Sequence, residues 1–129
     1  MKKEKYQLEY VFDTVTKQSL WRHVSAPVGL ESWFADNVDV QGSQYIFNWG
    51  DTQIDKANVL DLTEGERIRF KWENDATNDS YFEFAIHNME LTGGKTLEIT
   101  DFATDDEKTD AIELWDSLVE RLRKSLGAG

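Results

Sequence analysis

The clearest hydrophobic pattern lies near the C-terminal end of the chain, between Thr104 and Gly127. Apolar residues recur there every three or four positions, as they do on the buried stripe of an amphipathic helix. Thr104 and Glu107 have the spacing of a capping box, and Gly127 is a typical helix stop. The stripe consists of Ala111, Ile112, Trp115, Leu118, Val119, Leu122 and Leu126. This pattern predicts one helix, roughly 33 Å long, that needs a large apolar partner.

The N-terminal part of the chain predicts one strand followed by two short helices. Apolar and polar residues alternate over 5–12, which is typical of a half-buried strand. Thr16 stands where an N-cap would precede a helix over 17–24. Pro27 is the only proline, and it separates this helix from a second one over 28–34. The inward side chains expected in the two helices are Leu20, Trp21, Val24, Leu30, Trp33 and Phe34.

The middle of the chain, 38–103, predicts a series of short strands. Runs of alternating polarity are separated by Gly, Asn and Asp clusters, among them a polar loop at 74–79 and a tight hairpin at Gly93-Gly94. The phase changes within the run 52–62, which indicates a β-bulge or a twist. The inward positions of the clearest strands are Tyr45, Phe47, Trp49, Ile68, Phe70, Trp72, Phe82, Phe84, Ile86, Leu97 and Ile99.

Together these elements predict an α+β fold in a single domain over residues 1–129. One strand, two short helices, about six hairpin-linked strands and one long helix follow one another without a repeat or a linker. We expect a curved antiparallel sheet of about six to seven strands, whose aromatic concave face receives the long helix. A chain of 129 residues with 40% hydrophobic content is large enough to bury such a core.

The charge and composition argue against several classes of partner and site. The 25 acidic and 14 basic residues give a net charge of -11, which repels nucleic-acid phosphates and anionic membrane surfaces. The absence of cysteine excludes disulfides, zinc–thiolate sites and cysteine nucleophiles. No apolar run has the length of a signal-peptide core or a membrane span. We therefore expect a cytoplasmic protein without a cofactor or a bound metal.

Several segments carry a resemblance to a known family. They are LWRHVSAPVGLESWF (20–34), GSQYIFNWG (42–50), LTEGERIRFKWE (62–73) and GGKTLEITDF (93–102), followed by a closing helix with Trp115 and Leu118. In this order and spacing they resemble the START-like superfamily, also called SRPBCC, helix-grip or birch-pollen-allergen-like. More narrowly, they resemble its branch related to activators of the heat-shock chaperone ATPase. Two features depart from that pattern: Ala57 stands where many relatives have Gly, and the segment after Phe102 is short and acidic.

The resemblance implies a helix-grip fold with a cavity between the long helix and the sheet. In relatives this space holds lipids, polyketides, steroids or other apolar molecules, and some relatives use it for catalysis. The candidate walls are Trp33, Phe34, Tyr45, Phe47, Trp49, Phe70, Trp72, Phe84, Ile86, Ile99, Trp115, Leu118, Val119 and Leu122. The same side chains would also make an ordinary packed core, and the sequence favours neither interpretation.

Polar groups among the inward positions are candidates for orienting a ligand. Asp101 continues the inward phase of the last strand and is expected at the cavity mouth, although a turn residue that accepts from backbone donors would explain it as well. Asn88 continues the inward phase of the preceding strand. The indole N–H groups of Trp49 and Trp72 are further candidates to bind the polar end of a ligand.

No catalytic constellation stands out in the sequence. His23 and His87 are the only histidines, and each is interpreted as a surface or structural imidazole. The acidic clusters lack the spacing of a calcium-binding loop, and the cluster at 101–106 is explained by helix capping. There is no nucleophile elbow and no glycine-rich phosphate loop.

Three function hypotheses follow. The first is binding of a small hydrophobic ligand, of lipid or polyketide-like kind, in the cavity beneath the long helix. The second is a protein-interaction or co-chaperone-like module that uses the outer strand face at Tyr81, Ala85, His87 and Met89. A homodimer is a further candidate assembly. The third is an enzyme of the cyclase or aromatase kind.

Overall fold

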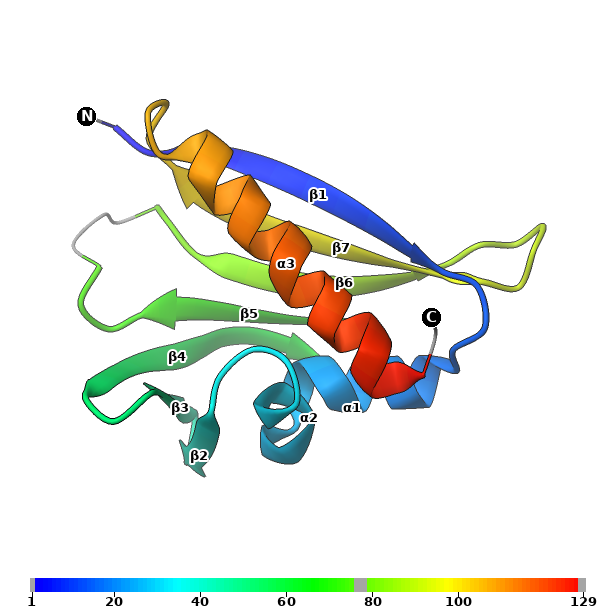
Figure 1. Cartoon of the computed structure of the whole chain (residues 1–129), viewed down its shortest axis with the longest axis horizontal. Coiled ribbons are helices and arrows are strands. Elements are labelled where there is room, and N and C mark those ends of the chain that lie inside the picture. The colour runs from blue at the N-terminus through cyan, green and yellow to red at the C-terminus, as the bar shows by residue number, and fades with distance from the viewer. Residues whose placement is uncertain (1, 76–78, 128–129) are drawn as a thin grey trace.

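The computed structural model describes residues 2–75 and 79–127. Along the described chain the elements are β1 (Glu4–Phe12), α1 (Lys17–Ser25), α2 (Pro27–Glu31), β2 (Asn37–Gln41), β3 (Gln44–Trp49), β4 (Gln53–Thr63), β5 (Arg67–Trp72), β6 (Phe82–Asn88), β7 (Lys95–Ala103) and α3 (Lys108–Leu126). The strands form one antiparallel sheet in the order β1-β7-β6-β5-β4-β3-β2. Figure 1 shows α3 lying diagonally across one face of this sheet, with α1 near its C-terminal end. The predicted α+β helix-grip fold is confirmed.

The face of the sheet beneath α3, called the inner face below, carries the aromatic and aliphatic side chains that the strand patterns predict. Phe70, Phe84 and Ile99 are fully buried there. Because successive strand residues point to opposite faces, charged residues such as Arg69 and Glu83 alternate with them on the outer face. The core therefore lies between α3 and the inner face.

The predicted irregularity in β4 is a β-bulge. The register against β5 shifts between Val59 and Asp61, which leaves Leu60 without an opposite residue and 54% exposed. Before the bulge, Asp55 lies opposite Phe47 on β3 and therefore belongs to the inner phase. The first half of β4 thus brings polar residues to the face that α3 covers elsewhere.

The long helix begins later than its capping-box pattern predicts. α3 starts at Lys108, after Glu107, and no side chain caps its first N–H groups. The Thr104 hydroxyl instead lies 2.7 Å from the carboxylates of Asp106 and Glu107. The reason is that β7 continues to Ala103, so the next four residues must form the turn that folds the chain back over the sheet.

The predicted end of α3 is confirmed. Gly127 adopts a left-handed conformation with φ 70°, and its N–H donates to Lys124 O at 3.2 Å. The helix has 19 residues, which corresponds to roughly 28 Å. No described helix is long and apolar enough to cross a membrane.

The predicted boundaries of α2, of β6 and of the hairpin after β6 are wrong. α2 starts at Pro27 and ends at Glu31, because proline fits the first helical position and the chain turns away after Ser32. β6 is shorter than the predicted run 81–91, and its connection to β7 occupies 89–94 instead of a tight two-residue hairpin. The polar loop predicted at 74–79 lies partly outside the described residues.

The packing of α1 against α2 depends on one glycine. The N-cap Thr16 of α1 accepts from Ser19 N at 3.0 Å, as predicted. At Gly29 in α2, an added Cβ would lie 2.2 Å from Arg22 O and 2.5 Å from His23 Cα. Only a residue without a side chain lets the two helix backbones approach this closely.

Acidic side chains occupy backbone donors on the edge strand β2. Glu31 Oε2 accepts from Val38 N at 2.9 Å, and Asp39 Oδ1 accepts from Val40 N at 3.0 Å. Val38 and Val40 lie opposite Phe47 and Tyr45 of β3, but their N–H groups donate to these carboxylates and therefore point toward the open edge of the sheet.

Candidate functional site

A half-open pocket of about 520 Å³ lies between α3 and the inner face of the sheet. Its aromatic walls are Phe34, Trp49, Trp72, Phe82 and Trp115, and its aliphatic walls are Ala111, Leu114 and Leu118. Its polar groups are Gln53, Asp55, Asp101 and Arg121. The volume falls within the range of roughly 300–1,000 Å³ typical of small-molecule sites.

The aromatic walls belong to one interlocked cluster. Phe34 follows α2 and stacks on Trp115 of α3 with ring centroids 5.9 Å apart and planes at 15°. Phe82 stacks on Trp72 at 4.8 Å, and it also stacks on Phe34 at 5.9 Å. Trp49 Nε1 donates to Phe34 O at 2.8 Å, which fixes the end of β3 to the segment after α2. These contacts hold the pocket walls in place.

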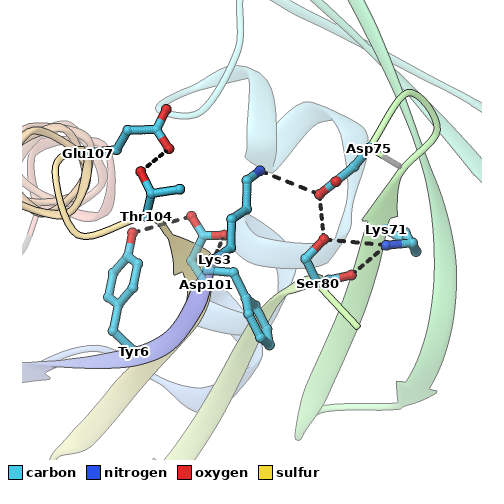
Figure 2. A network of polar contacts seen from close by, with 9 residues as sticks. Lys3, Tyr6, Lys71, Asp75, Ser80, Asp101, Thr104 and Glu107 are labelled. Atoms are coloured by element: carbon cyan, nitrogen blue, oxygen red, sulfur yellow. Dashed lines mark hydrogen bonds and ion pairs between the residues drawn. The ribbon is translucent and has the colours of Figure 1, made fainter. Parts of the chain in front are cut away.

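Asp101 is the polar residue most firmly positioned in the pocket. Its Oδ2 accepts from Trp115 Nε1 at 3.1 Å and from the Tyr6 hydroxyl at 3.4 Å, and its Oδ1 accepts from Phe102 N at 2.8 Å. Figure 2 shows the Tyr6 hydroxyl pointing at the carboxylate from the neighbouring strand β1. Burial raises the pKa of Asp101, and the three hydrogen bonds only partly oppose this rise. Burial likewise raises the pKa of Tyr6, and the neighbouring carboxylate adds to the rise.

A second polar network lies beside Asp101 at the same end of the sheet. Lys3 Nζ is 3.6 Å from Asp75 Oδ2, and the Ser80 hydroxyl donates to the same carboxylate (Figure 2). Lys71 Nζ donates to Ser80 O at 2.8 Å. The network links the start of β1 to the end of β5 and to the residues before β6.

The C-terminal half of α3 is fixed to the rest of the fold. The Tyr10 hydroxyl donates to Asp116 Oδ1 at 2.6 Å, and Arg123 donates to Val11 O at 2.7 Å. The Arg123 guanidinium also lies 4.4 Å from the centre of the Phe12 ring. Burial raises the pKa of Tyr10, and its bond to Asp116 reinforces the rise. In this half, Val119 and Leu122 close the core, while Leu118 and Arg121 line the pocket.

The structure divides the predicted wall residues into two groups. The pocket is lined by Phe34, Trp49, Trp72, Asp101, Trp115 and Leu118. The other apolar candidates lie outside its lining, and the buried ones among them belong to the core: Trp33, Phe47, Phe70, Phe84, Ile86, Ile99, Val119 and Leu122. Each of the two interpretations left open by the sequence therefore describes one part of the space beneath α3.

Three predicted candidates occupy places outside the pocket lining. Tyr45 is half-buried and donates its hydroxyl to Ser25 O at 2.7 Å, so it links β3 to α1. Asn88 is exposed at the end of β6, because the strand leaves the core there. The fully buried Trp33 donates its indole N–H to His23 O at 2.7 Å.

Sequence reasoning missed six lining residues: Gln53, Asp55, Phe82, Ala111, Leu114 and Arg121. A signal existed for two of them, because Phe82 shares the inward phase of its strand and Ala111 belongs to the apolar stripe. Gln53 and Asp55 gave no such signal, since polar residues on an inward strand phase are normally read as solvent-facing.

The histidines have structural or surface positions, as the sequence indicated. His23 Nδ1 donates to Ser19 O at 2.8 Å, and its Nε2 lies 3.2 Å from Ser125 Oγ on α3. The His87 side chain is 57% exposed on the outer face, 3.9 Å from Glu98. Within residues 2–75 and 79–127, no cluster of three or more His, Asp or Glu side chains could hold a metal ion.

Comparison with known proteins decides the family. The model of the START-like superfamily domain matches residues 1–128. The chain belongs to the START-like superfamily. This membership confirms the resemblance predicted from the sequence segments. No curated protein sequence matches this START-like chain significantly.

Solved structures with the same START-like fold come from several sources. A Bacteroides fragilis protein solved by solution NMR is 44% identical with a TM-score of 0.70, over 97% of this chain and 92% of that chain. The Aha1 dimer of Colwellia psychrerythraea is 12% identical with a TM-score of 0.79, over 95% and 96%. DynU16, a putative protein in the dynemicin biosynthetic locus, is 17% identical with a TM-score of 0.79, over 97% of this chain and 48% of that chain. The two similarities below 25% identity establish a shared fold alone.

Proposed function

We propose that this START-like protein binds a small hydrophobic ligand, of lipid or polyketide-like kind, in the pocket beneath α3. The observation that carries the proposal is a pocket of about 520 Å³ with eight apolar and four polar lining residues. START-like domains commonly bind hydrophobic molecules, and this chain belongs to that superfamily. DynU16, which shares the fold, is described as a protein of the dynemicin biosynthetic locus.

Two stripes of side chains on α3 explain why a pocket exists beside a filled core. Val119 and Leu122 are 1% and 0% exposed, so their stripe of the helix packs directly on the fold. Leu114, on the neighbouring stripe, is 61% exposed although it lines the pocket. When a ligand covers an open apolar surface beside aromatic rings, the burial favours binding by roughly 25 cal/mol per Å² of apolar surface removed from water.

The proposal is tested by titration with the neutral dye Nile red and with lipid extracts. Trp49, Trp72 and Trp115 line the pocket, so occupation should change tryptophan emission and raise the melting temperature. Ala111→Phe fills the pocket from α3 and should weaken dye binding at least about tenfold, or about 1.4 kcal/mol. Ser117→Phe adds the same ring at an exposed position outside the pocket and is the matched control.

Two outcomes would contradict ligand binding in this pocket. One is that neither emission nor melting temperature responds to any apolar compound. The other is that Ala111→Phe and Ser117→Phe bind the dye equally well, which would place binding elsewhere on the surface.

The contacts on the outer face do not favour the protein-interaction hypothesis. On the outer face, Ala85 is buried, and the Arg69 guanidinium covers the Tyr81 ring at 4.0 Å, so little apolar surface is left there for a partner. Arg69 is also paired with Glu83 at 2.8 Å. The Aha1 relative is described as a dimer, and a homodimer of this chain is a proposal that analytical ultracentrifugation would test.

A further inference from the structure

The polar groups of the pocket point to a charge preference in its ligand. Building on ligand binding in this pocket, we propose that the site is selective for a compact hydrophobic amine, whose ammonium group lies between the aromatic walls and the carboxylate of Asp101. The inference rests on the position of Asp101, on the type of aromatic wall and on the unequal burial of the pocket's charged groups.

Asp101 offers a preformed acceptor, and its carboxylate takes part in no ion pair within the described part of the chain. The three donors that hold its carboxylate, from Tyr6, Trp115 and the backbone of Phe102, are all neutral. An ionised carboxylate has about four lone-pair sites, so one remains for a ligand. Lys3 is the cation that acts on Asp101, and its influence is the weakest of those that bear on the carboxyl group. Burial therefore disfavours the charged form, and an ammonium in the pocket would offset that cost.

The aromatic walls also suit a cation. Trp49, Trp72 and Trp115 all line the pocket, and indole faces attract cations more strongly than other aromatic rings do. Trp72 Nε1 makes no hydrogen bond to the described residues, while Trp49 and Trp115 use theirs to orient their rings. In the proposed complex an organic ammonium lies against these indoles while its apolar part covers Leu114 and Leu118.

The remaining charges of the pocket reinforce this preference. Asp55 is half-buried, and Gln53 Nε2 donates to its carboxylate at 3.0 Å. Arg121 is the opposing charge, but its side chain is exposed, where solvent and salt weaken its influence. The negative groups are thus the more buried ones. The net charge of -11 draws cations toward the protein and repels carboxylate ligands such as fatty acids.

The test compares three probes with the same aromatic body by isothermal titration calorimetry. Naphthylmethylamine is a cation, naphthylmethanol is neutral and naphthoate is an anion. We expect the amine to bind at least about tenfold more tightly than the alcohol, and the anion to bind least tightly. Asp101→Asn should reduce the affinity for the amine more than the affinity for the alcohol, so that the preference is lost.

Two further variants separate a local contact from a general field effect. Asp105→Asn removes the same charge from an exposed position outside the pocket, and it should keep the preference for the amine. Asp55→Asn removes the second pocket carboxylate and should reduce the preference partly. It also keeps the proposal testable if Asp101→Asn does not fold.

The outcomes distinguish this inference from ligand binding itself. Equal affinity for the three probes overturns the charge preference and leaves hydrophobic binding intact. Tighter binding of naphthoate that is lost in Arg121→Ala also overturns it and assigns an anion site. If Nile red binds but none of the three probes does, the inference fails alone, whereas absence of binding by all four compounds overturns both proposals.

Discussion

At the scale of single residues, Asp101 connects the fold to the proposed site. The same carboxylate joins β1, β7 and α3 and faces a pocket. A half-buried acid of this kind reduces stability when it is ionised, unless its partners compensate fully. The raised pKa of Asp101 indicates that they do not.

This cost predicts a pH dependence for Asp101→Asn. Because the folded pKa of Asp101 is raised above 3.8, proton binding favours the folded state. The stability that the protonated group contributes is complete below pH 3.8 and is lost as the pH rises through the folded pKa. The melting temperature of Asp101→Asn minus that of the wild type should therefore increase between about pH 3 and pH 7. Thermal unfolding of both proteins across this range measures the difference, and a decrease would contradict the assignment.

Gly29 provides a second prediction at this scale. Helix propensity alone favours Gly29→Ala by about 1 kcal/mol. The added Cβ would lie 2.2 Å from Arg22 O. We therefore expect overpacking to lower the free energy of unfolding by about 1–3 kcal/mol. Chemical denaturation measures this loss. At Gly42 nothing lies within 4 Å and φ is +63°, so Gly42→Ala should cost only the conformational strain of about 1 kcal/mol. A stabilised Gly29→Ala variant would contradict the close approach of the helices.

At the scale of elements, α3 is one helix with two different environments. One stripe of the helix, with Val119 and Leu122, packs on the core. A neighbouring stripe, with Leu114, Leu118 and Arg121, lines the pocket. Equal substitutions on the two stripes should therefore have unequal effects.

A matched pair of leucines tests this division. Leu122→Ala deletes a fully buried side chain and should destabilise the protein by about 2–5 kcal/mol. Leu114→Ala, at a side chain that is 61% exposed on the same helix, should change stability by less than about 0.5 kcal/mol. Urea denaturation compares the two variants, and equal losses of stability would mean that both stripes of α3 pack equally on the fold.

The same helix shows which features the sequence could predict. The apolar stripe and the strand phases depend on local periodicity, so residues such as Phe70, Phe84 and Leu122 are buried as expected. The start of α3 could not be predicted, because Thr104 and Glu107 fit both a capping box and a turn. The turn forms because β7 continues to Ala103, and the end of β7 is set by its pairing with β1.

The polar wall of the pocket could not be predicted for a related reason. Gln53 and Asp55 lie on an inward strand phase, which sequence patterns assign to apolar residues. Whether such residues meet solvent, core or pocket depends on how far α3 extends over the sheet. That extent is set by contacts between segments distant in the chain, such as Trp115 with Asp101.

At the scale of the whole molecule, the excess of acidic residues opposes compaction. A net charge of -11 on 129 residues produces self-repulsion in the folded state, and the repulsion decreases when salt screens it. We expect the melting temperature at pH 7 to rise by a few degrees when sodium chloride increases from about 10 mM to about 500 mM. Near the isoelectric point of 4.5 the same salt step should have a much smaller effect. An equal rise at both pH values would attribute the stabilisation to general salt effects.

The acidic residues also determine where the sheet ends. Glu31 and Asp39 occupy two of the N–H groups on the open side of β2. A strand from another molecule would find these donors already bonded and would meet negative charge beside them, so the sheet cannot extend easily in that direction. Natural proteins protect exposed sheet edges against intermolecular pairing with charged side chains. In this protein, the carboxylates of Glu31 and Asp39, bonded to alternate N–H groups of β2, act as a barrier to edge-to-edge aggregation on the β2 side.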